Sequence, residues 1–258
     1  MKEHPIIFSG DMVRTILEGR KTQTRRPVKQ YSVSSVRRVA GPFKGSKTSL
    51  WDFIFPDEND PSKDGNGHLV ECPFGQVGDR LWVREVFALE SLVETGQEPP
   101  FWDGRPIQYW NDGIPCSWES AEYWVQPHYK ATDPTPQLMY EDSDGEPTVR
   151  WKPSIHMPRW ASRITLEITE IRVERVQKIT NDEARKEGIV DGGCLNCGYP
   201  EPCGCERPEP SPVDAFIDLW NSIYEKKCLG WQANPLVWVV GFKLIEAKGG
   251  QLEPLQPS

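Results

Sequence analysis

Residues 164–176 read ITLEITEIRVERV, and they carry the clearest strand pattern in the chain. Apolar and polar side chains alternate from Ile164 to Ile168, and the alternation resumes out of phase from Ile171 to Val176. Successive side chains of a strand point to opposite faces, so this alternation is typical of a strand that buries one face. The stretch therefore predicts a fold built on a sheet.

Shorter segments on both sides extend this prediction. Strand patterns occur at residues 6–8, 80–87, 123–131 and 236–245. Helices are expected after Ser9, which can cap a first turn, and over residues 180–188 and 213–225. Several short strands, with helices near the start and between the late strands, predict an α+β fold with a small curled sheet.

Composition indicates the domain organisation. Of the 258 residues 37% are hydrophobic, and the chain contains 21 glycines and 24 prolines. This balance favours one modest core with long polar loops, so we expect a single domain over residues 1–247 and a disordered tail over residues 248–258. The expected irregular insertions are residues 40–78, 90–122 and 133–150 and the cysteine-rich residues 191–212.

The same sequence favours a cytoplasmic protein. It has no run of 18 apolar residues, and the apolar segment at residues 6–8 is too short for the core of a signal peptide. Its seven cysteines are odd in number and unevenly spread, which fits reduced thiols or a metal site better than a disulfide framework.

Charge is distributed unevenly. The whole chain has a formal net charge of -8, which argues against a role in coating or packaging nucleic acid. Residues 14–38, in contrast, hold eight basic residues and one acid, Glu18. A basic patch on an acidic body suits a small anionic or nucleotide-like ligand, or a short stretch of nucleic acid. The alternative is a solvated run of charge.

Lys21 and Thr24 are candidate catalytic residues. Gly19 stands where a helix ends, so residues 20–26 are expected to leave the helix in a loop. If that loop keeps a helical turn, residues three apart point the same way and can meet. A lysine whose pKa falls on burial can act as a base, and a threonine hydroxyl can be a nucleophile or can donate to an oxyanion.

Glu85 is the third candidate. It shares a strand face with the apolar residues of the segment 80–87, and a carboxylate on an apolar face needs a partner or a purpose. As a general acid or base it would protonate a leaving amine, and the three residues together could hydrolyse an amide. The alternative is that Glu85 pairs with Arg84, Arg80 or Lys21 at the end of the strand.

Basic and aromatic residues suggest a binding surface. Arg25 and Arg26, next to Arg20, could grip a phosphate, and Arg159, Trp160 and Arg163 combine cations with an aromatic ring as base-stacking sites do. The alternative is that Trp160 packs in the core and the arginines pair with acids. Other tryptophans expected in the core are Trp82, Trp220 and Trp238.

Four cysteines lie within 12 residues, at positions Cys194, Cys197, Cys203 and Cys205. Four thiolates on tight turns suit tetrahedral zinc, and an all-cysteine set leaves no open position for catalysis. The interpretation is a structural zinc, with free thiols on an insertion as the alternative. No cofactor is expected for catalysis.

Several of these segments resemble the ASCH family. The stretch Gly19-Arg20-Lys21-Thr22-Gln23-Thr24-Arg25, followed by Arg26, is similar to its G-x-K-x-x-T-x-R signature. Residues 78–85 (GDRLWVRE) resemble its turn and strand with a terminal glutamate, and residues 182–189 (DEARKEGI) resemble its late helix. Residues 157–163 (MPRWASR) and 231–239 (WQANPLVWV) resemble its phage and prophage branch.

The resemblance implies a PUA-like β-barrel that recognises RNA or modified nucleosides. Some small bacterial members are amidohydrolases that deacetylate N4-acetylcytidine with a lysine, a threonine and a glutamate, and another member is described as a ribonuclease. The matching positions here are Lys21, Thr24 and Glu85. Two hypotheses follow: an amidohydrolase acting on a modified nucleobase, and a phage protein that binds RNA or modified DNA without catalysis.

Overall fold

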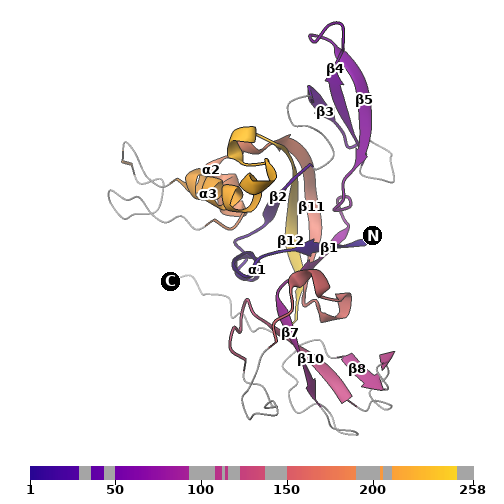
Figure 1. Ribbon diagram of the computed structural model, residues 1–258, viewed down its shortest axis with the longest axis vertical. Helices are drawn as coiled ribbons and strands as arrows, with labels where there is room; N and C mark the ends of the chain where they lie inside the picture. The colour runs from indigo at the N-terminus through magenta and orange to yellow at the C-terminus, as the bar shows by residue number, and fades with distance from the viewer. Residues whose placement is uncertain are drawn as a thin grey trace. The chain divides into compact units, whose positions relative to one another are not determined.

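The computed structural model describes residues 1–28, 36–43, 50–92, 108–111, 114–115, 123–136, 150–189, 204–205 and 211–248 (Figure 1). These residues form a mixed α+β structure with mostly strands and few helices, which confirms the predicted class. Among them, no helix is long and apolar enough to cross a bilayer.

The chain divides into two compact units. The first unit contains Met1–Lys2, Arg20–Arg80 and Glu167–Lys243. The second unit contains Glu3–Gly19, Leu81–Leu166 and Leu244–Ser258. The single domain over residues 1–247 stays a prediction.

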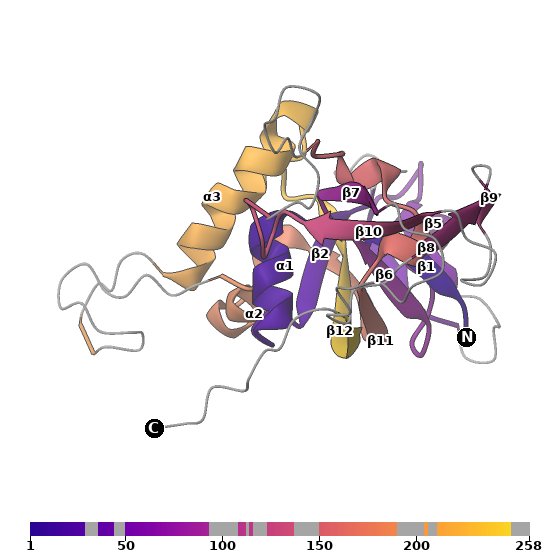
Figure 2. The same cartoon turned by 90° about the horizontal axis from the view of Figure 1, so that it is seen from below.

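The largest sheet has the strand order β1-β6-β11-β12-β2. Its long strands, β11 (Ile164–Arg175) and β12 (Leu236–Ala247), are two that the sequence predicts (Figure 2). In β11 the side chains of Ile164, Leu166 and Ile168 are fully buried, as the alternation requires. β1 covers Glu3–Ile7 and β6 covers Arg80–Arg84.

Strand β2 (Gln23–Pro27) corrects the prediction of a loop over residues 20–26. It pairs antiparallel with β12 in the first unit, with Arg25 opposite Val239 and Thr24 opposite Val240. The sequence QTRRP has no strand signal of its own. The strand forms because β12 supplies hydrogen-bond partners for its backbone, so tertiary pairing overrides local propensity.

The predicted helices are confirmed. In the second unit α1 (Gly10–Leu17) is capped by the Ser9 side chain, and Gly19 follows it with a φ of 74°. In the first unit α2 (Asn181–Lys186) and α3 (Pro212–Tyr224) both begin with a capping box and pack against each other (Figure 1). The core beneath them contains Val176, Ile179, Ala184, Phe216, Trp220, Val237 and Val239.

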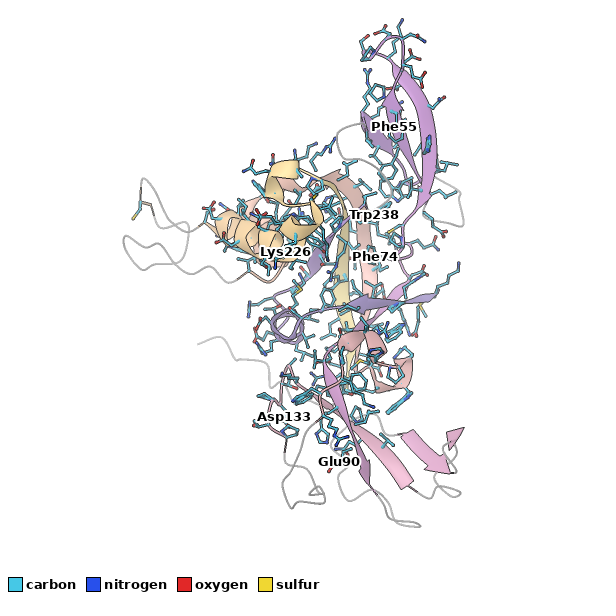
Figure 3. All side chains as sticks on the ribbon, in the orientation of Figure 1. Phe55, Phe74, Glu90, Asp133, Lys226 and Trp238 are labelled. Carbon is cyan, nitrogen blue, oxygen red and sulfur yellow. The ribbon has the colours of Figure 1, made fainter. Side chains whose placement is uncertain are left out.

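Residues 40–78 are more regular than the sequence predicts. Strands β3 (Arg38–Ala40), β4 (Leu50–Pro56) and β5 (Asp64–Glu71) form a three-stranded sheet. Trp51 and Phe53 of β4 pack edge-on against Trp238, which Figure 3 labels. Pro56 and Pro61 therefore lie at the turn end of the β4–β5 hairpin, and residues 50–71 form a hairpin where an irregular insertion was expected.

The second unit holds a four-stranded sheet of order β7-β10-β8-β9. Its strands are β7 (Phe87–Leu92), β8 (Gln108–Asn111), β9 (Ile114–Pro115) and β10 (Tyr123–Tyr129). β10 is predicted, whereas β8 and β9 fall where the sequence predicts an irregular segment. The single strand expected over residues 80–87 is divided into β6 and β7, so Glu85 lies between two strands.

Candidate active site

Lys21 is enclosed in the first unit, with a side chain that is 0% exposed. Its Nζ donates to the Glu187 backbone carbonyl at 2.7 Å and to Glu187 Oε2 at 3.0 Å. Glu187 caps the C-terminus of α2, and the Thr22 amide donates to the Lys186 carbonyl at 2.9 Å. This backbone bond ties the start of β2 to the end of α2 and so brings Lys21 to Glu187.

Arg25 contacts three carboxylates with one buried guanidinium. Its Nη1 lies 3.2 Å from Glu187 Oε1, and its Nη2 lies 2.7 Å from Glu174 Oε1 and 2.9 Å from Glu183 Oε2. Glu183 belongs to α2 and Glu174 to β11, so one side chain of β2 connects both elements. Glu187 is thus shared, with one carboxylate oxygen on Lys21 and the other on Arg25.

Arg172 of β11 extends this cluster. Its Nη1 lies 2.8 Å from Glu170 Oε1, its Nε lies 3.2 Å from Glu174 Oε2, and its Nη2 pairs with Glu183. The six residues that we call the Lys21 network are Lys21, Arg25, Arg172, Glu174, Glu183 and Glu187.

Burial lowers the pKa of Lys21, because an enclosed ammonium loses its hydration. Glu187 acts in the opposite direction through its charge and its hydrogen bond, and the nearby cations Arg26 and Arg25 lower the pKa further. A lysine of this kind can be an unprotonated amine nearer to neutral pH than an exposed one, and that form can accept a proton or attack a carbonyl carbon.

Thr24 does not share a helical turn with Lys21. Residues 23–27 are a strand, in which Thr24 and Arg25 point to opposite faces. The premise that Lys21 and Thr24 point the same way through a helical turn is therefore wrong, although Thr24 is also buried, at 2% exposed. Gln23 shares the face of Arg25, and its buried Nε2 has no hydrogen-bond partner among the described residues.

The three arginines of the signature segment differ in accessibility. Arg25 is 3% exposed and already contacts three carboxylates, so this arrangement does not favour the phosphate contact expected of it, which stays a prediction. Arg20 is exposed and donates to the Gly188 carbonyl at 3.4 Å, and Arg26 is half-buried. Arg20 and Arg26 are the better placed of the three to reach an anion.

Glu85 lies in the second unit, where it forms a buried ion pair with Arg163. The pair is bidentate, with Nε to Oε1 and Nη2 to Oε2 both at 3.0 Å, and the side chains are 1% and 2% exposed. Arg163 Nη1 also donates to Thr132 Oγ1 at 3.0 Å, and Arg163 Cζ lies 4.1 Å from the centre of the Tyr129 ring. Glu85 is thus paired with an arginine, as the alternative from the sequence expected, but the partner is Arg163 and not Arg84, Arg80 or Lys21.

Burial raises the pKa of Glu85, and the charge and hydrogen bonds of Arg163 oppose that rise. A carboxyl group whose pKa is raised keeps its proton to higher pH than an exposed glutamate and is better suited to donate it. The pKa direction is therefore compatible with the general acid expected from the sequence, whereas the bidentate contact with Arg163 occupies both carboxylate oxygens.

Arg159 and Trp160 have different surroundings from Arg163. Arg159 is exposed, pairs with Glu3 at 2.7 and 3.1 Å, and lies with its Cζ 6.0 Å from the centre of the Trp82 ring. Trp160 packs against the hydrophobic cluster around Phe87, which is the alternative considered from the sequence.

Trp82 is half-buried and so lies outside the core where the sequence places it. Arg84 joins Arg159 beside it, with its Cζ 5.4 Å from the centre of the Trp82 ring. Trp220 and Trp238 are each 2% exposed, so their placement in the core is confirmed.

Sequence reasoning missed the acidic partners of the site. Glu183 and Glu187 are four residues apart and so lie on one face of α2, a spacing that the sequence does display. Glu174 has no comparable signal. A second buried pair was also missed: His128 Nε2 lies 2.8 Å from Glu90 Oε2 in the second unit, where Figure 3 labels Glu90.

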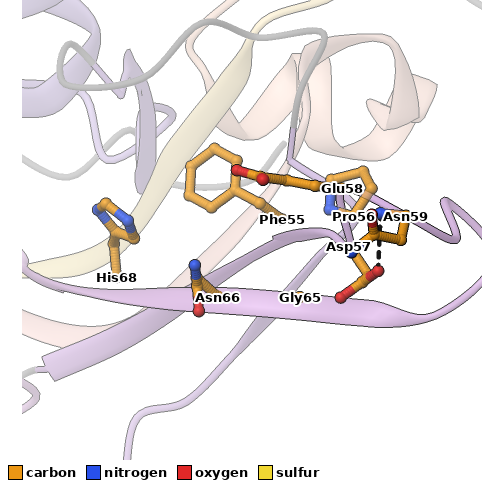
Figure 4. A pocket seen from close by; sticks show the side chains of 8 residues that line it. All are labelled: Phe55, Pro56, Asp57, Glu58, Asn59, Gly65, Asn66 and His68. Carbon is orange, nitrogen blue, oxygen red and sulfur yellow. Dashed lines mark hydrogen bonds between the residues drawn. The ribbon is translucent and has the colours of Figure 1, made fainter.

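A separate hollow of about 410 Å³ occurs at the turn end of the β4–β5 hairpin (Figure 4). The residues that line it are Phe55, Pro56, Asp57, Glu58, Asn59, Gly65, Asn66 and His68. A Cβ at Gly65 would come within 2.6 Å of the Pro56 carbonyl oxygen, so the two strands approach closely here. The residues of the Lys21 network do not line this hollow.

The structure leaves the zinc site untested. Cys194, Cys197 and Cys203 lie outside the described residues, and Cys205 is described and half-buried. Among the residues that are described, no group of three or more histidine, cysteine, aspartate or glutamate side chains could hold a metal ion.

Comparison of the chain with protein-family models, with curated proteins and with solved structures found no match.

Proposed function

We propose that this protein recognises a modified nucleoside or RNA in the manner of ASCH proteins and hydrolyses an acyl amide on the base, as in N4-acetylcytidine. The observation that carries the proposal is the Lys21–Glu187 contact. It holds an enclosed lysine amine at a fixed position, and burial lowers the pKa of that amine. The ASCH resemblance of residues 19–25 supplies the substrate class, and it brings with it the expectation of a PUA-like barrel in a cytoplasmic protein.

The proposed reaction is hydrolysis. Unprotonated Lys21 Nζ accepts a proton from water as the water oxygen bonds to the acyl carbon. The bond between that carbon and N4 of the base then breaks, and N4 receives a proton. The products are acetate and cytidine. The opposite orientations of Thr24 and Arg25 in β2 favour water over Thr24 as the attacking group, and Thr24→Val tests the other choice.

Lys21 is the proposed source of the proton that N4 receives, because its Nζ then carries the proton taken from water. Glu85 belongs to the second unit and stays a prediction from the ASCH resemblance, which Glu85→Gln tests because glutamine keeps the shape but carries no acidic proton. Lys21 is fully enclosed in the structure, so the reaction also requires that substrate binding opens access to Nζ.

The alternative role of the Lys21 network is purely structural, since buried ion pairs also fix packing. The two roles are separated by an assay of purified protein against N4-acetylcytidine and an acetylated RNA oligonucleotide, with the products quantified by mass spectrometry. Wild type and Lys178→Met, which changes an exposed lysine of the same unit, are expected to release cytidine. Lys21→Met is expected to release at least about 100-fold less, as for loss of a general base.

Circular dichroism completes this test. A Lys21→Met protein that is folded yet inactive supports the proposal. A folded wild type that releases no cytidine from either substrate refutes it.

A second candidate, binding without catalysis, is favoured by the exposed surface around Trp82 in the second unit. Arg84 and Arg159 both lie over its ring, and an aromatic ring flanked by cations is the usual platform for a single-stranded nucleic acid. The Arg159–Glu3 pair is exposed, so a phosphate can replace Glu3 at a small cost in free energy.

Fluorescence anisotropy with a labelled single-stranded RNA tests this candidate. Arg84→Gln is expected to weaken binding, and Arg150→Gln, an exposed arginine of the same unit, serves as the control. Equal affinity of the two variants would reject this surface.

A further inference from the structure

Glu187 has one carboxylate and two cationic partners. Oε2 accepts from Lys21 Nζ at 3.0 Å, and Oε1 accepts from Arg25 Nη1 at 3.2 Å. All three side chains are enclosed, with exposed fractions of 0%, 0% and 5% for Lys21, Arg25 and Glu187. Solvent therefore screens these contacts little, and a change in one partner acts directly on the other.

The remaining groups of the Lys21 network keep every carboxylate paired with a cation in both protonation states of Lys21. When Lys21 is protonated, the network contains three cations and three carboxylates. When Lys21 is neutral, Arg25 still contacts all three carboxylates, and Arg172 contacts two of them as well. Loss of the Lys21 proton therefore leaves no carboxylate of the network without a cation.

We propose that Arg25 is a positioning residue that holds Glu187 as a shared partner and thereby allows Lys21 to release its proton inside the folded protein. This inference rests on the proposed function in so far as it assigns Lys21 the part of a base. Arg25 acts through Glu187 and does not touch the reacting atoms.

The charged groups around Lys21 come from three elements. Arg25 and Arg26 belong to β2, Glu183 and Glu187 to α2 and its C-terminus, and Glu174 and Arg172 to β11. Arg20 reaches the same end of α2 through the Gly188 carbonyl, and Lys186 offers its carbonyl to Thr22. The Glu187 carboxylate contacts Nζ directly, so its sharing with Arg25 changes how strongly the buried lysine holds its proton.

Two substitutions then have opposite effects. Arg25→Gln leaves the whole Glu187 carboxylate to Lys21 and removes a nearby positive charge, so Lys21 should hold its proton to higher pH. Glu187→Gln removes the negative partner while Arg25 remains, so Lys21 should lose its proton at lower pH. If Arg25 acted through its charge alone, Arg25→Gln and Arg172→Gln would shift the Lys21 midpoint upward to a similar extent.

The test is a pH titration of the full-length protein labelled with ¹³C-lysine, followed by NMR. The Lys21 side-chain resonance is assigned by its absence from Lys21→Arg. Relative to wild type, the midpoint is expected about one pH unit or more higher in Arg25→Gln and about one unit or more lower in Glu187→Gln. Arg172→Gln, which removes a positive charge from the network but none of the Glu187 contacts, is the matched control and is expected to shift the midpoint by less than half as much.

If Arg25→Gln does not fold, Arg25→Lys replaces it, because one ammonium cannot hold the three carboxylates that the guanidinium holds. Its midpoint is also expected above that of wild type. Shifts of the same sign in the Arg25 and Glu187 variants, or no shift in either, overturn the inference.

The titration needs no substrate, so it separates the two claims. Opposite shifts in a protein without turnover would retain the role of Arg25 and reject the proposed reaction. Turnover without opposite shifts would do the reverse.

Discussion

Replacing Arg163 with methionine removes the guanidinium that neutralises the enclosed carboxylate of Glu85 in the second unit. The Glu85 side chain is 1% exposed and takes two hydrogen bonds of 3.0 Å from Arg163. Removing one partner of a buried pair leaves the other charge without compensation, at a cost of about 3–5 kcal/mol. We expect Arg163→Met to lower the free energy of unfolding by an amount in this range at pH 8.

The Arg159–Glu3 pair provides a matched control. It is also bidentate, at 2.7 and 3.1 Å, but its side chains are 41% and 39% exposed. Exposed pairs contribute about 0–1 kcal/mol, so Arg159→Met should cost no more than that. The measurement is urea unfolding of wild type and both variants, followed by circular dichroism.

The cost of Arg163→Met should depend on pH with a definite sign. Burial already raises the pKa of Glu85, and loss of Arg163 removes the contacts that oppose the rise. A carboxyl group whose pKa is higher in the folded than in the unfolded chain contributes stability to the protein at low pH. That contribution is lost as pH rises through the folded pKa. The deficit of Arg163→Met should therefore be smaller at pH 5 than at pH 8. Equal costs for the two arginine variants at pH 8, or a deficit that shrinks as pH rises, would refute the buried-pair reasoning.

Two further results are expected. Gly19→Ala should lower the free energy of unfolding by about 1–2 kcal/mol, because alanine is strained at the Gly19 φ of 74°. Gly10→Ala at the start of α1 is the control and should be neutral or stabilising. A Gly19→Ala protein as stable as wild type in urea would contradict this prediction. Burial raises the pKa of the Cys72 thiol to about 12, and Cys228 is exposed. Iodoacetamide at pH 7.5 should therefore alkylate Cys228 and spare Cys72 in the folded protein, as measured by peptide mass spectrometry. Equal labelling would show that Cys72 is accessible.

The elements that the sequence predicts correctly are those with their own local signal. β11 alternates in two runs, from Ile164 to Ile168 and again from Ile171, and α2 and α3 carry capping boxes at Thr180 and Ser211. These signals depend on neighbouring residues in the chain, so they can be interpreted without knowing the tertiary structure.

The missed elements depend on a partner. β2 is polar and becomes a strand by pairing with β12, and β4 forms its sheet with β3 and β5. The candidate site shows the same limit. Enclosure of Glu85 could be anticipated from its apolar strand face, whereas Lys21 was expected in a loop. Their ion partners Arg163 and Glu187 are distant in the chain and meet them only through the fold.

The proposed base chemistry of Lys21 has one most direct test. Wild-type protein is incubated with N4-acetylcytidine, and the cytidine and acetate released over time are quantified beside Lys21→Met. We expect equal amounts of the two products from wild type and almost none from the folded Lys21→Met protein. Release of cytidine at the same rate by both proteins would contradict the assignment of Lys21 as the base.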